Sequence, residues 1–218
     1  IVIIGGGFTG LSSAYNLRRK FPDKKVVVLE GACCGYGASG RNGGFAGAGI
    51  PGLMSYTERM GPEAGLKAYD ASFHGLDQIK EVIAEHGVEC DFEETGALHA
   101  AISQEHAEHL EKEYQTYRSM GFDATLVQGK ELEAEVRSPR YVAGMKFPYG
   151  AMLNPAKLAR EMKRVVESAG AEVRERTVTL RVTPGKVHRI ETELGEITAP
   201  TLVLGLNGYS HKLGFFRN

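Results

Sequence analysis

The sequence has few cysteines, no charge imbalance and no long apolar run. Each of these absences argues against a class of protein. Its 218 residues include 26 basic and 27 acidic side chains, which gives a formal net charge of −1. This balance creates no general field that attracts nucleic acid or anionic lipid. No apolar run approaches the length that spans a membrane, and the apolar residues 1–4 are too few for a signal peptide. We therefore expect neither nucleic acid nor a membrane as a partner.

Three cysteines, Cys33, Cys34 and Cys90, are an odd number. Two of them are adjacent, and adjacent cysteines rarely pair because a disulfide between them strains the backbone. Free thiols are typical of a reducing compartment, so we expect a cytoplasmic location. A redox-active dithiol at Cys33–Cys34 is the alternative interpretation.

Several common catalytic and metal-binding motifs are also missing. The sequence has no Gly-x-Ser-x-Gly nucleophile elbow and no Cys-x-x-Cys pair. His106 and His109 lie three residues apart on one predicted helix, a spacing that can grip a metal ion. No third ligand is evident near them, so the sequence predicts no metal site.

What the sequence does contain is a complete βαβ nucleotide-binding unit at its start. An apolar strand runs into Gly5-x-Gly7-x-x-Gly10, a helix follows, and a second apolar strand ends at Glu30. Gly5 allows the tight turn, Gly7 lets the backbone approach a pyrophosphate, and Gly10 allows helix and sheet to pack closely. A carboxylate at Glu30 can accept hydrogen bonds from ribose hydroxyls and repels a 2′-phosphate. The pattern predicts a dinucleotide site on a Rossmann-like α/β fold.

A second glycine-rich loop, residues 34–45, indicates which dinucleotide is bound. It follows the acid-ending strand directly and supplies small residues, the Ser39 hydroxyl, the Arg41 guanidinium and free N–H groups. These groups can contact a pyrophosphate and, beyond it, a flavin ring. Glycine-rich runs are often flexible linkers, but the position of this one immediately after Glu30 argues against that interpretation.

The run Gly-Ala-Ser-Gly-Arg-Asn-Gly-Gly at 37–44 resembles the flavin-contacting loop of the D-amino-acid oxidase (DAO) superfamily. The resemblance is greatest to the branch of glycine oxidase, sarcosine oxidase, D-amino-acid dehydrogenase and γ-glutamylputrescine oxidoreductase. Residues 152–159, with Asn154-Pro155 opening a helix, and the strand and loop at 199–209 extend the resemblance along the chain. The pair Gly205-Leu206 departs from the Ala-Thr that is common at this place in the family.

The resemblance implies FAD as the cofactor. Some members of the family tether their flavin through a histidine close to this loop, but residues 31–50 contain no histidine, so we expect non-covalent attachment as far as this segment shows. Phe45, just after the flavin loop, and Tyr149 are candidates for substrate contact from their positions, and ordinary packing is the alternative role for each. The expected cofactor-binding residues are Gly5, Gly7, Phe8, Thr9, Gly10, Glu30, Gly31, Ala38, Ser39, Arg41, Asn42, Gly43, Gly44, Val178, Gly205 and Asn207.

Between the nucleotide-binding segments, the pattern changes to that of a second domain. We expect an FAD-binding domain from residues 1–84 and 151–218, interrupted at 85–150 by the first part of a mixed-sheet substrate domain, α+β overall. Apolar spacing predicts helices over 66–83 and 107–117 and a short helix over 130–136. Two strands are expected within 88–102, one on each side of Thr95-Gly96. Further strands are expected at 123–128, 177–182, 187–194 and 201–204, with turns at Pro184-Gly185 and Gly195.

The resemblance also implies an activity, oxidation of a C–N bond in a small amine or amino acid. Hydride passes to flavin N5 and leaves an imine, and O2 or a downstream acceptor takes up the electrons. No catalytic residue is assigned, because the protein mainly aligns the substrate carbon and keeps the amine unprotonated. An NAD-dependent dehydrogenase and a non-catalytic FAD-binding fragment or subunit are the alternatives. The first residue lies within a strand, and family members continue well beyond residue 218, so we expect part of a longer enzyme.

Overall fold

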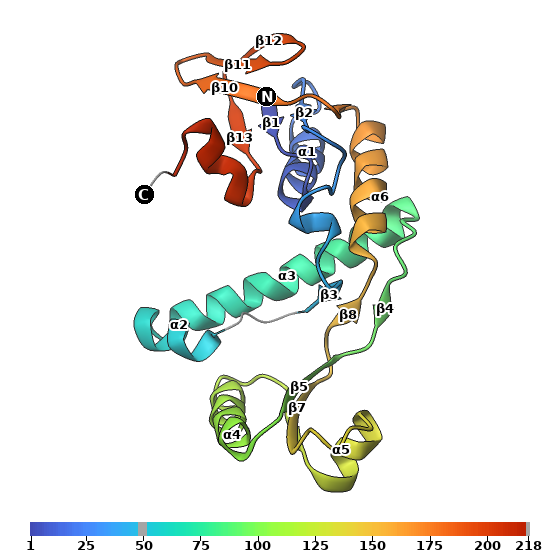
Figure 1. Ribbon diagram of the computed structural model, residues 1–218, viewed down its shortest axis with the longest axis vertical. Helices are drawn as coiled ribbons and strands as arrows, with labels where there is room; N and C mark the ends of the chain where they lie inside the picture. The colour runs from blue at the N-terminus through green and yellow to red at the C-terminus, as the bar shows by residue number, and fades with distance from the viewer. Residues whose placement is uncertain (48–51, 217–218) are drawn as a thin grey trace. The chain divides into compact units, whose positions relative to one another are not determined.

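The computed structural model describes residues 1–47 and 52–216, and its chain forms two compact units (Figure 1). The first unit comprises Ile1–Gly44, His86–Asp91 and Asn154–Asn218, and the second comprises Phe45–Glu85 and Phe92–Leu153. These boundaries differ from the expected domain limits, because residues 45–84 group with the second unit. The physical reason is that Leu53, Tyr69 and Phe73 pack into the aromatic core of the second unit.

The first unit is built on a four-stranded parallel sheet of order β13-β1-β2-β9. Strands β1 (Val2–Ile4) and β2 (Val27–Leu29) are central and buried along their whole length. Strands β9 (Glu172–Arg174) and β13 (Leu202–Leu204) flank them. A strand that is buried on both faces consists of consecutive apolar residues, which is why both central strands are recognisable in the sequence.

Two helices of the first unit, α1 (Phe8–Lys20) and α6 (Pro155–Ser168), pack against each other. Helix α1 begins directly after the first glycine turn and ends with three basic residues, which suit the negative end of its dipole. Helix α6 begins at Pro155 and is capped by Asn154, whose side chain accepts a hydrogen bond from the Lys157 N–H. The helix opening expected at Asn154-Pro155 is therefore confirmed.

A three-stranded antiparallel sheet belongs to the same unit: β10 (Thr179–Thr183), β11 (His188–Thr192) and β12 (Gly195–Ala199). Val182, Ile190 and Ala199 from this sheet share a core with β1 and β2. Strand β12 was not expected, since the sequence analysis placed only a turn at Gly195. Its polar residues alternate with only two inward-facing apolar ones, Ile197 and Ala199, which is a weak signal. The chain then passes through β13 into a 3-10 helix, η2 (Asn207–Leu213).

In its described residues, the second unit combines four helices with two small antiparallel sheets. Its helices are α2 (Leu53–Met60), α3 (Pro62–His86, all but its last residue), α4 (Gln104–Ser119) and α5 (Gly129–Glu135). One sheet has the order β5 (Ala97–Ala101), β7 (Ala143–Phe147), β6 (Thr125–Val127), and the other has the order β3 (Phe45–Ala46), β8 (Ala151–Met152), β4 (Glu93–Glu94). The three helices expected at 66–83, 107–117 and 130–136 are confirmed as α3, α4 and α5.

The two strands expected within residues 88–102, one on each side of Thr95-Gly96, are confirmed, but they do not pair with each other. Strands β4 and β5 both form, but β4 pairs with β8 and β5 pairs with β7. Between them, the Thr95 and Gly96 N–H groups both donate to the carbonyl of Gly150. Gly96 has a φ of +68°, and a Cβ there would lie 2.6 Å from the Phe147 oxygen. The Thr95-Gly96 turn is therefore held against the segment after β7 and passes the chain from one sheet to the other instead of reversing it.

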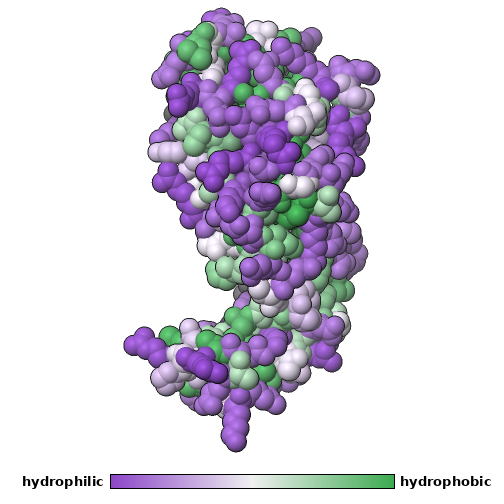
Figure 2. Space-filling view, turned by 90° about the vertical axis from the view of Figure 1, so that its right-hand side faces the viewer, coloured by the Kyte–Doolittle hydropathy of each residue, from purple (hydrophilic) through white to green (hydrophobic). Residues whose placement is uncertain are grey.

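Polar and charged side chains cover most of the face shown in Figure 2, with apolar groups in scattered patches. Within residues 1–47 and 52–216, no helix has both the length and the apolar character that crossing a bilayer requires.

Candidate functional site

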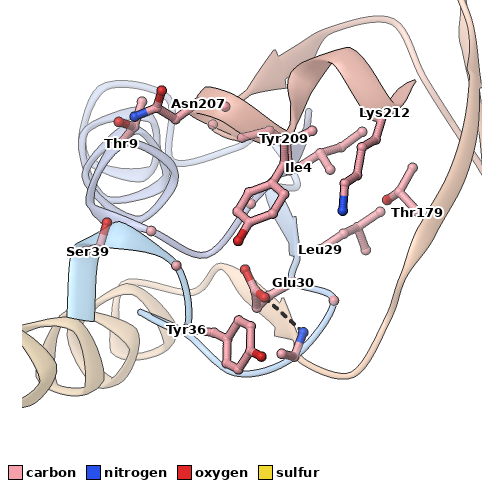
Figure 3. Close-up of a pocket in the computed structure, with 18 of the residues that line it drawn as sticks. Ile4, Thr9, Leu29, Glu30, Tyr36, Ser39, Thr179, Asn207, Tyr209 and Lys212 are labelled. Atoms are coloured by element: carbon pink, nitrogen blue, oxygen red, sulfur yellow. Dashed lines mark hydrogen bonds between the residues drawn. The ribbon is translucent and has the colours of Figure 1, made fainter. Parts of the chain in front are cut away.

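A cavity of about 630 Å³ lies in the first unit, at the carboxyl ends of β1, β2 and β13 (Figure 3). Its walls come from the loop after β1, the loop after β2, the segment that leads into β10, and η2 with the loop before it. The carboxyl edge of a parallel sheet is where α/β proteins bind their ligands, because the loops diverge there.

Glycines bring the backbone close together beside this cavity. Gly5 has a φ of +108°, and a Cβ on it would lie 2.6 Å from the carbonyl oxygen of Gly205. A Cβ on Gly10 would lie 1.9 Å from the carbonyl oxygen of Gly5, so helix α1 and the turn after β1 touch through backbone alone. Gly7 differs, because it lines the cavity and an added Cβ would meet only the Ser39 side chain, 2.8 Å from its Oγ.

Ser39 connects the two glycine loops at the start of α1. It lies on a short 3-10 helix, η1 (Ala38–Gly40), and its Oγ accepts a hydrogen bond of 2.9 Å from the Phe8 N–H. The N-cap residue, Gly7, has no side chain of its own to do this. The Ser39 hydroxyl proton finds no acceptor among the described residues, so it is available to a ligand. Together with the positive end of the α1 dipole, this arrangement suits an anion such as a pyrophosphate.

The Glu30 carboxylate is fixed by two backbone hydrogen bonds of 2.8 Å each. Its Oε2 accepts from the Gly6 N–H and its Oε1 accepts from the Ala32 N–H. Each carboxylate oxygen has a second lone pair, so both remain able to accept a further hydrogen bond. Figure 3 shows the carboxylate within the cavity between Tyr36 and Tyr209. A rigidly held acceptor pair in this place matches the vicinal hydroxyls of a ribose.

The cavity wall beside Glu30 is made by the segment that precedes β10. The Thr177 N–H donates to the carbonyl of Glu30, and the Arg176 N–H donates to the carbonyl of Ala32. A Cβ on Gly31 would lie 3.6 Å from a methyl group of Val178, so the two residues form one wall of the cavity. This contact brings Val178, which is distant in the sequence, beside the other predicted residues that line the cavity.

Ten of the predicted cofactor-binding residues line the cavity together: Gly5, Gly7, Thr9, Glu30, Gly31, Ala38, Ser39, Val178, Gly205 and Asn207. The other six, Phe8, Gly10, Arg41, Asn42, Gly43 and Gly44, are not among its lining residues. Phe8 and Gly10 contact residues of the cavity wall: the Phe8 N–H donates to Ser39, and Gly10 packs against the backbone of Gly5.

Arg41 and Asn42 organise the second glycine loop from within. The Asn42 amide donates to the carbonyls of Ala38 and Ser39, at 3.1 Å each, and its Oδ1 accepts from the Gly44 N–H. The Arg41 guanidinium donates to the carbonyl of Tyr36 and lies 4.4 Å from the centre of its ring. Direct contact of these residues, and of Gly43 and Gly44, with a cofactor remains a prediction.

The sequence analysis did not identify several residues of the cavity wall, among them Tyr36, Thr179, Tyr209 and Lys212. Tyr36 lies inside the glycine-rich loop, where an aromatic residue between glycines was an available signal. Tyr209 and Lys212 come from the 3-10 helix η2, and no motif or periodicity announced this helix.

Cys34 lies beneath the loop that carries Glu30. Burial, together with the neighbouring carboxylates of Glu175 and Glu30, raises the pKa of its thiol to about 12. Its N–H donates to Glu175, which forms an ion pair with Lys163 on α6 at 2.8 Å. All three cysteines are free, as expected, with Cys33 exposed and Cys34 and Cys90 buried. Because its protonated thiol is not nucleophilic, Cys34 is suited to packing and not to dithiol chemistry.

The two residues expected to contact substrate belong to the second unit. Phe45 on β3 is 82% exposed. Tyr149 packs edge-on against Phe73, with ring centres 4.7 Å apart, and its hydroxyl bonds that of buried Tyr69. Their contact with substrate remains a prediction. Across the described ranges, no group of three or more His, Cys, Asp or Glu side chains is arranged to hold a metal ion.

Comparison with known proteins assigns this architecture to a family. γ-Glutamylputrescine oxidoreductase of Escherichia coli is 28% identical over 217 residues, which cover 96% of this chain and 49% of the relative. Glycine oxidase from Geobacillus kaustophilus has a crystal structure that matches with a TM-score of 0.82 at 22% identity, over 98% of this chain and 56% of that one. For L-proline dehydrogenase from P. horikoshii the TM-score is 0.76 at 19% identity, over 100% and 56%.

The chain thus spans about half the length of the relatives it matches. The family described as FAD dependent oxidoreductase, or DAO, matches residues 1–216. With almost all of its residues inside that match, the chain belongs to the DAO family of FAD-dependent oxidoreductases, and its cofactor is FAD.

Proposed function

We propose that this chain is the FAD-binding part of an enzyme that oxidises a C–N bond in a small amine or amino acid. The observation that carries the proposal is the cavity that places the α1 N-terminus, the Ser39 hydroxyl and the Glu30 carboxylate on one ligand-sized space. Family membership supports the redox chemistry, and the names of the relatives, which refer to glycine, proline and γ-glutamylputrescine, support the substrate class.

The residues present fit a dinucleotide. Gly7 leaves room for a pyrophosphate, and the Ser39 hydroxyl has a free proton to donate to it. Glu30 accepts hydrogen bonds from the ribose hydroxyls while its backbone bonds hold it in place. When bound, FAD supplies the two-electron acceptor that takes a hydride from the carbon next to nitrogen, leaving an imine that water hydrolyses. The chain's own contribution is to hold the nucleotide half still, so that the reactive end keeps one orientation.

We further propose the first unit as the FAD-binding domain and the second as part of a substrate-binding domain. The first unit contains the whole cavity. The second contains Phe45, whose ring is exposed, and Tyr149, whose hydroxyl pairs with Tyr69. Exposed aromatic surface next to a cofactor loop in the sequence is suited to covering a small substrate.

The test is to purify the full-length protein, record its absorbance spectrum and measure the mass of the released cofactor by mass spectrometry. We expect FAD, and anaerobic bleaching of the visible flavin band by at least one of glycine, sarcosine, D-alanine, proline or a polyamine conjugate. Readmitting air separates an oxidase, which then makes hydrogen peroxide, from a dehydrogenase, which needs a dye acceptor. Bound FAD that no amine or amino acid reduces contradicts C–N oxidation and favours a non-catalytic FAD-binding subunit.

A further inference from the structure

Two side chains of η2, Tyr209 and Lys212, reach into the cavity although neither was among the predicted cofactor-binding residues. The Tyr209 ring lies beside the second glycine loop, because a Cβ on Gly37 would be 3.8 Å from its Cε2 atom. Figure 3 shows the Tyr209 ring extending from η2 towards Glu30, with its hydroxyl on the side that faces Glu30 and Ser39. Tyr209 therefore spans from the loop after β13 to the loop after β2.

The Lys212 ammonium lies 5.1 Å from the centre of the Tyr209 ring and points into the same cavity (Figure 3). Within the described residues, no carboxylate comes close enough to form an ion pair with it, whereas Lys163 in the same unit is paired with Glu175. The contact with the face of the Tyr209 ring holds the Lys212 ammonium at the cavity. Lys212 thus presents three N–H donors to a ligand without an acidic partner that competes for them.

The position of Lys212 along the cavity indicates which part of a ligand it faces. Figure 3 places its ammonium beside Leu29 and Thr179, at the opposite end from Ser39 and the α1 N-terminus. Leu206 and Leu213 line the cavity as well, so this end is largely apolar. A pyrophosphate at Ser39 and a ribose at Glu30 leave this apolar end for the base attached to that ribose. A purine has a flat apolar surface and ring nitrogens that accept hydrogen bonds, which suits both features.

We infer that Tyr209 and Lys212 clamp the adenosine half of the dinucleotide, with Tyr209 covering the ribose and Lys212 contacting the adenine base. The inference rests on the assignment of the cavity to the cofactor and is independent of the substrate. It assigns η2 a direct role in affinity, since a ligand held between Glu30 and Tyr209 leaves only when the ring moves.

The test is calorimetric titration of the full-length protein, stripped of flavin, with FAD, ADP and adenosine. Lys212→Met keeps the length of the side chain and removes the charge, and we expect it to weaken all three ligands by a similar factor of about ten. Lys186→Met is the matched control, because Lys186 is an exposed lysine of the same unit in the turn before β11 and lies outside the cavity. For Tyr209, replacement by Phe keeps the ring and the affinity, and replacement by Leu loses about tenfold.

Each other outcome overturns a separate step. A loss for FAD and ADP with none for adenosine places Lys212 on the phosphates and removes the adenine assignment. Unchanged affinity of Lys212→Met and Tyr209→Leu for all three ligands, with unfolding temperatures like that of the wild type, removes the clamp. If the wild-type protein binds FAD and neither ADP nor adenosine, the placement of adenosine in this cavity fails. If it binds no FAD, the proposed function itself fails.

Discussion

Three glycines next to the cavity are required for three separate physical reasons. Gly5 has a positive φ, and Gly10 has no room for a Cβ against the Gly5 carbonyl. Gly7 has an ordinary backbone conformation, with a φ of −84°, and is restricted only by the Ser39 side chain and by the space it leaves for a ligand. Gly7 is therefore the position where a substitution tests ligand binding with the least effect on the fold.

We expect Gly7→Val to abolish FAD binding, because the branched side chain fills the pyrophosphate space and displaces Ser39. The measurement is the flavin-to-protein ratio of the purified variant, with circular dichroism to check that it is folded. Gly75→Ala is the control, since Gly75 is exposed on α3 and an added Cβ meets nothing within 4 Å. A folded Gly7→Val variant that retains one FAD per chain contradicts the assignment of the site.

Glu30 is the acceptor in the cavity whose orientation is fixed from two sides. We expect Glu30→Ala to weaken FAD by about 1–3 kcal/mol, the range for hydrogen bonds to a charged group. Part of that loss comes from the Gly6 and Ala32 N–H groups, which lose their acceptor. Glu30→Gln keeps one acceptor oxygen and places its amide N–H2 against the other backbone donor, so we expect a loss of FAD affinity in this variant as well. An unchanged FAD dissociation constant in Glu30→Ala means that the carboxylate only organises the loop.

The cysteines differ sharply in their expected reactivity. The pKa of Cys34 is raised to about 12 by burial, Glu175 and Glu30, and burial also raises the pKa of Cys90. At pH 8 both thiols are protonated and covered, so only exposed Cys33 reacts quickly with an aromatic disulfide reagent. We expect one fast thiol per native chain and three in denaturant. Two fast thiols in the native protein contradict the buried position of Cys34 or Cys90.

At the scale of the element, α6 depends on its first residue. The Asn154 side chain accepts from the Lys157 N–H at 3.1 Å. The Lys157 ammonium, and secondarily the Asn154 amide, hold the pKa of Asp91 below its ordinary value. Leu158, Ala159 and Val165 are buried along the helix, so a frayed first turn disturbs the core of the first unit.

We therefore expect Asn154→Ala to lower the free energy of unfolding by about 1 kcal/mol, the usual cost of losing an N-cap. Denaturant unfolding of the two proteins measures the difference. Asn154→Ser restores an acceptor at the same place and recovers most of the loss. If Ser and Ala are equally destabilising, the effect comes from the Asp91 contact and not from the cap.

Which elements could be predicted follows from how local their signals are. The first βαβ unit and helices α3, α4 and α6 carry their determinants within their own residues: glycine spacing, apolar periodicity and a cap. Strands β4 and β5 were recognisable, but their partners β8 and β7 lie about fifty residues further on, and no local pattern specifies that pairing. Lys212 was missed for a related reason, because its place in the cavity depends on the whole path of the chain through β13 and η2.

At the scale of the molecule, the two units are interleaved along the chain. The backbone passes between them after Gly44, after Glu85, after Asp91 and after Leu153. Neither unit is a continuous segment, so no single cut of the chain separates them. The first unit nevertheless contains every residue that lines the cavity. Of the two units, the first is thus expected to supply the contacts of this chain with the cofactor.

Non-covalent attachment of FAD is the prediction that concerns the protein as a whole. Residues 31–50 contain no histidine that could tether a flavin near this loop. Cys34 is buried against Gly6, next to the ribose-side acceptor Glu30, and is far too weak an acid to act as a nucleophile. Acid precipitation of the full-length protein is therefore expected to leave a yellow supernatant. A pellet that stays yellow after washing, with a flavin-bearing peptide that maps to residues 1–218, contradicts this expectation. A flavin peptide from sequence outside this range leaves the reasoning on these residues intact and identifies a tether elsewhere.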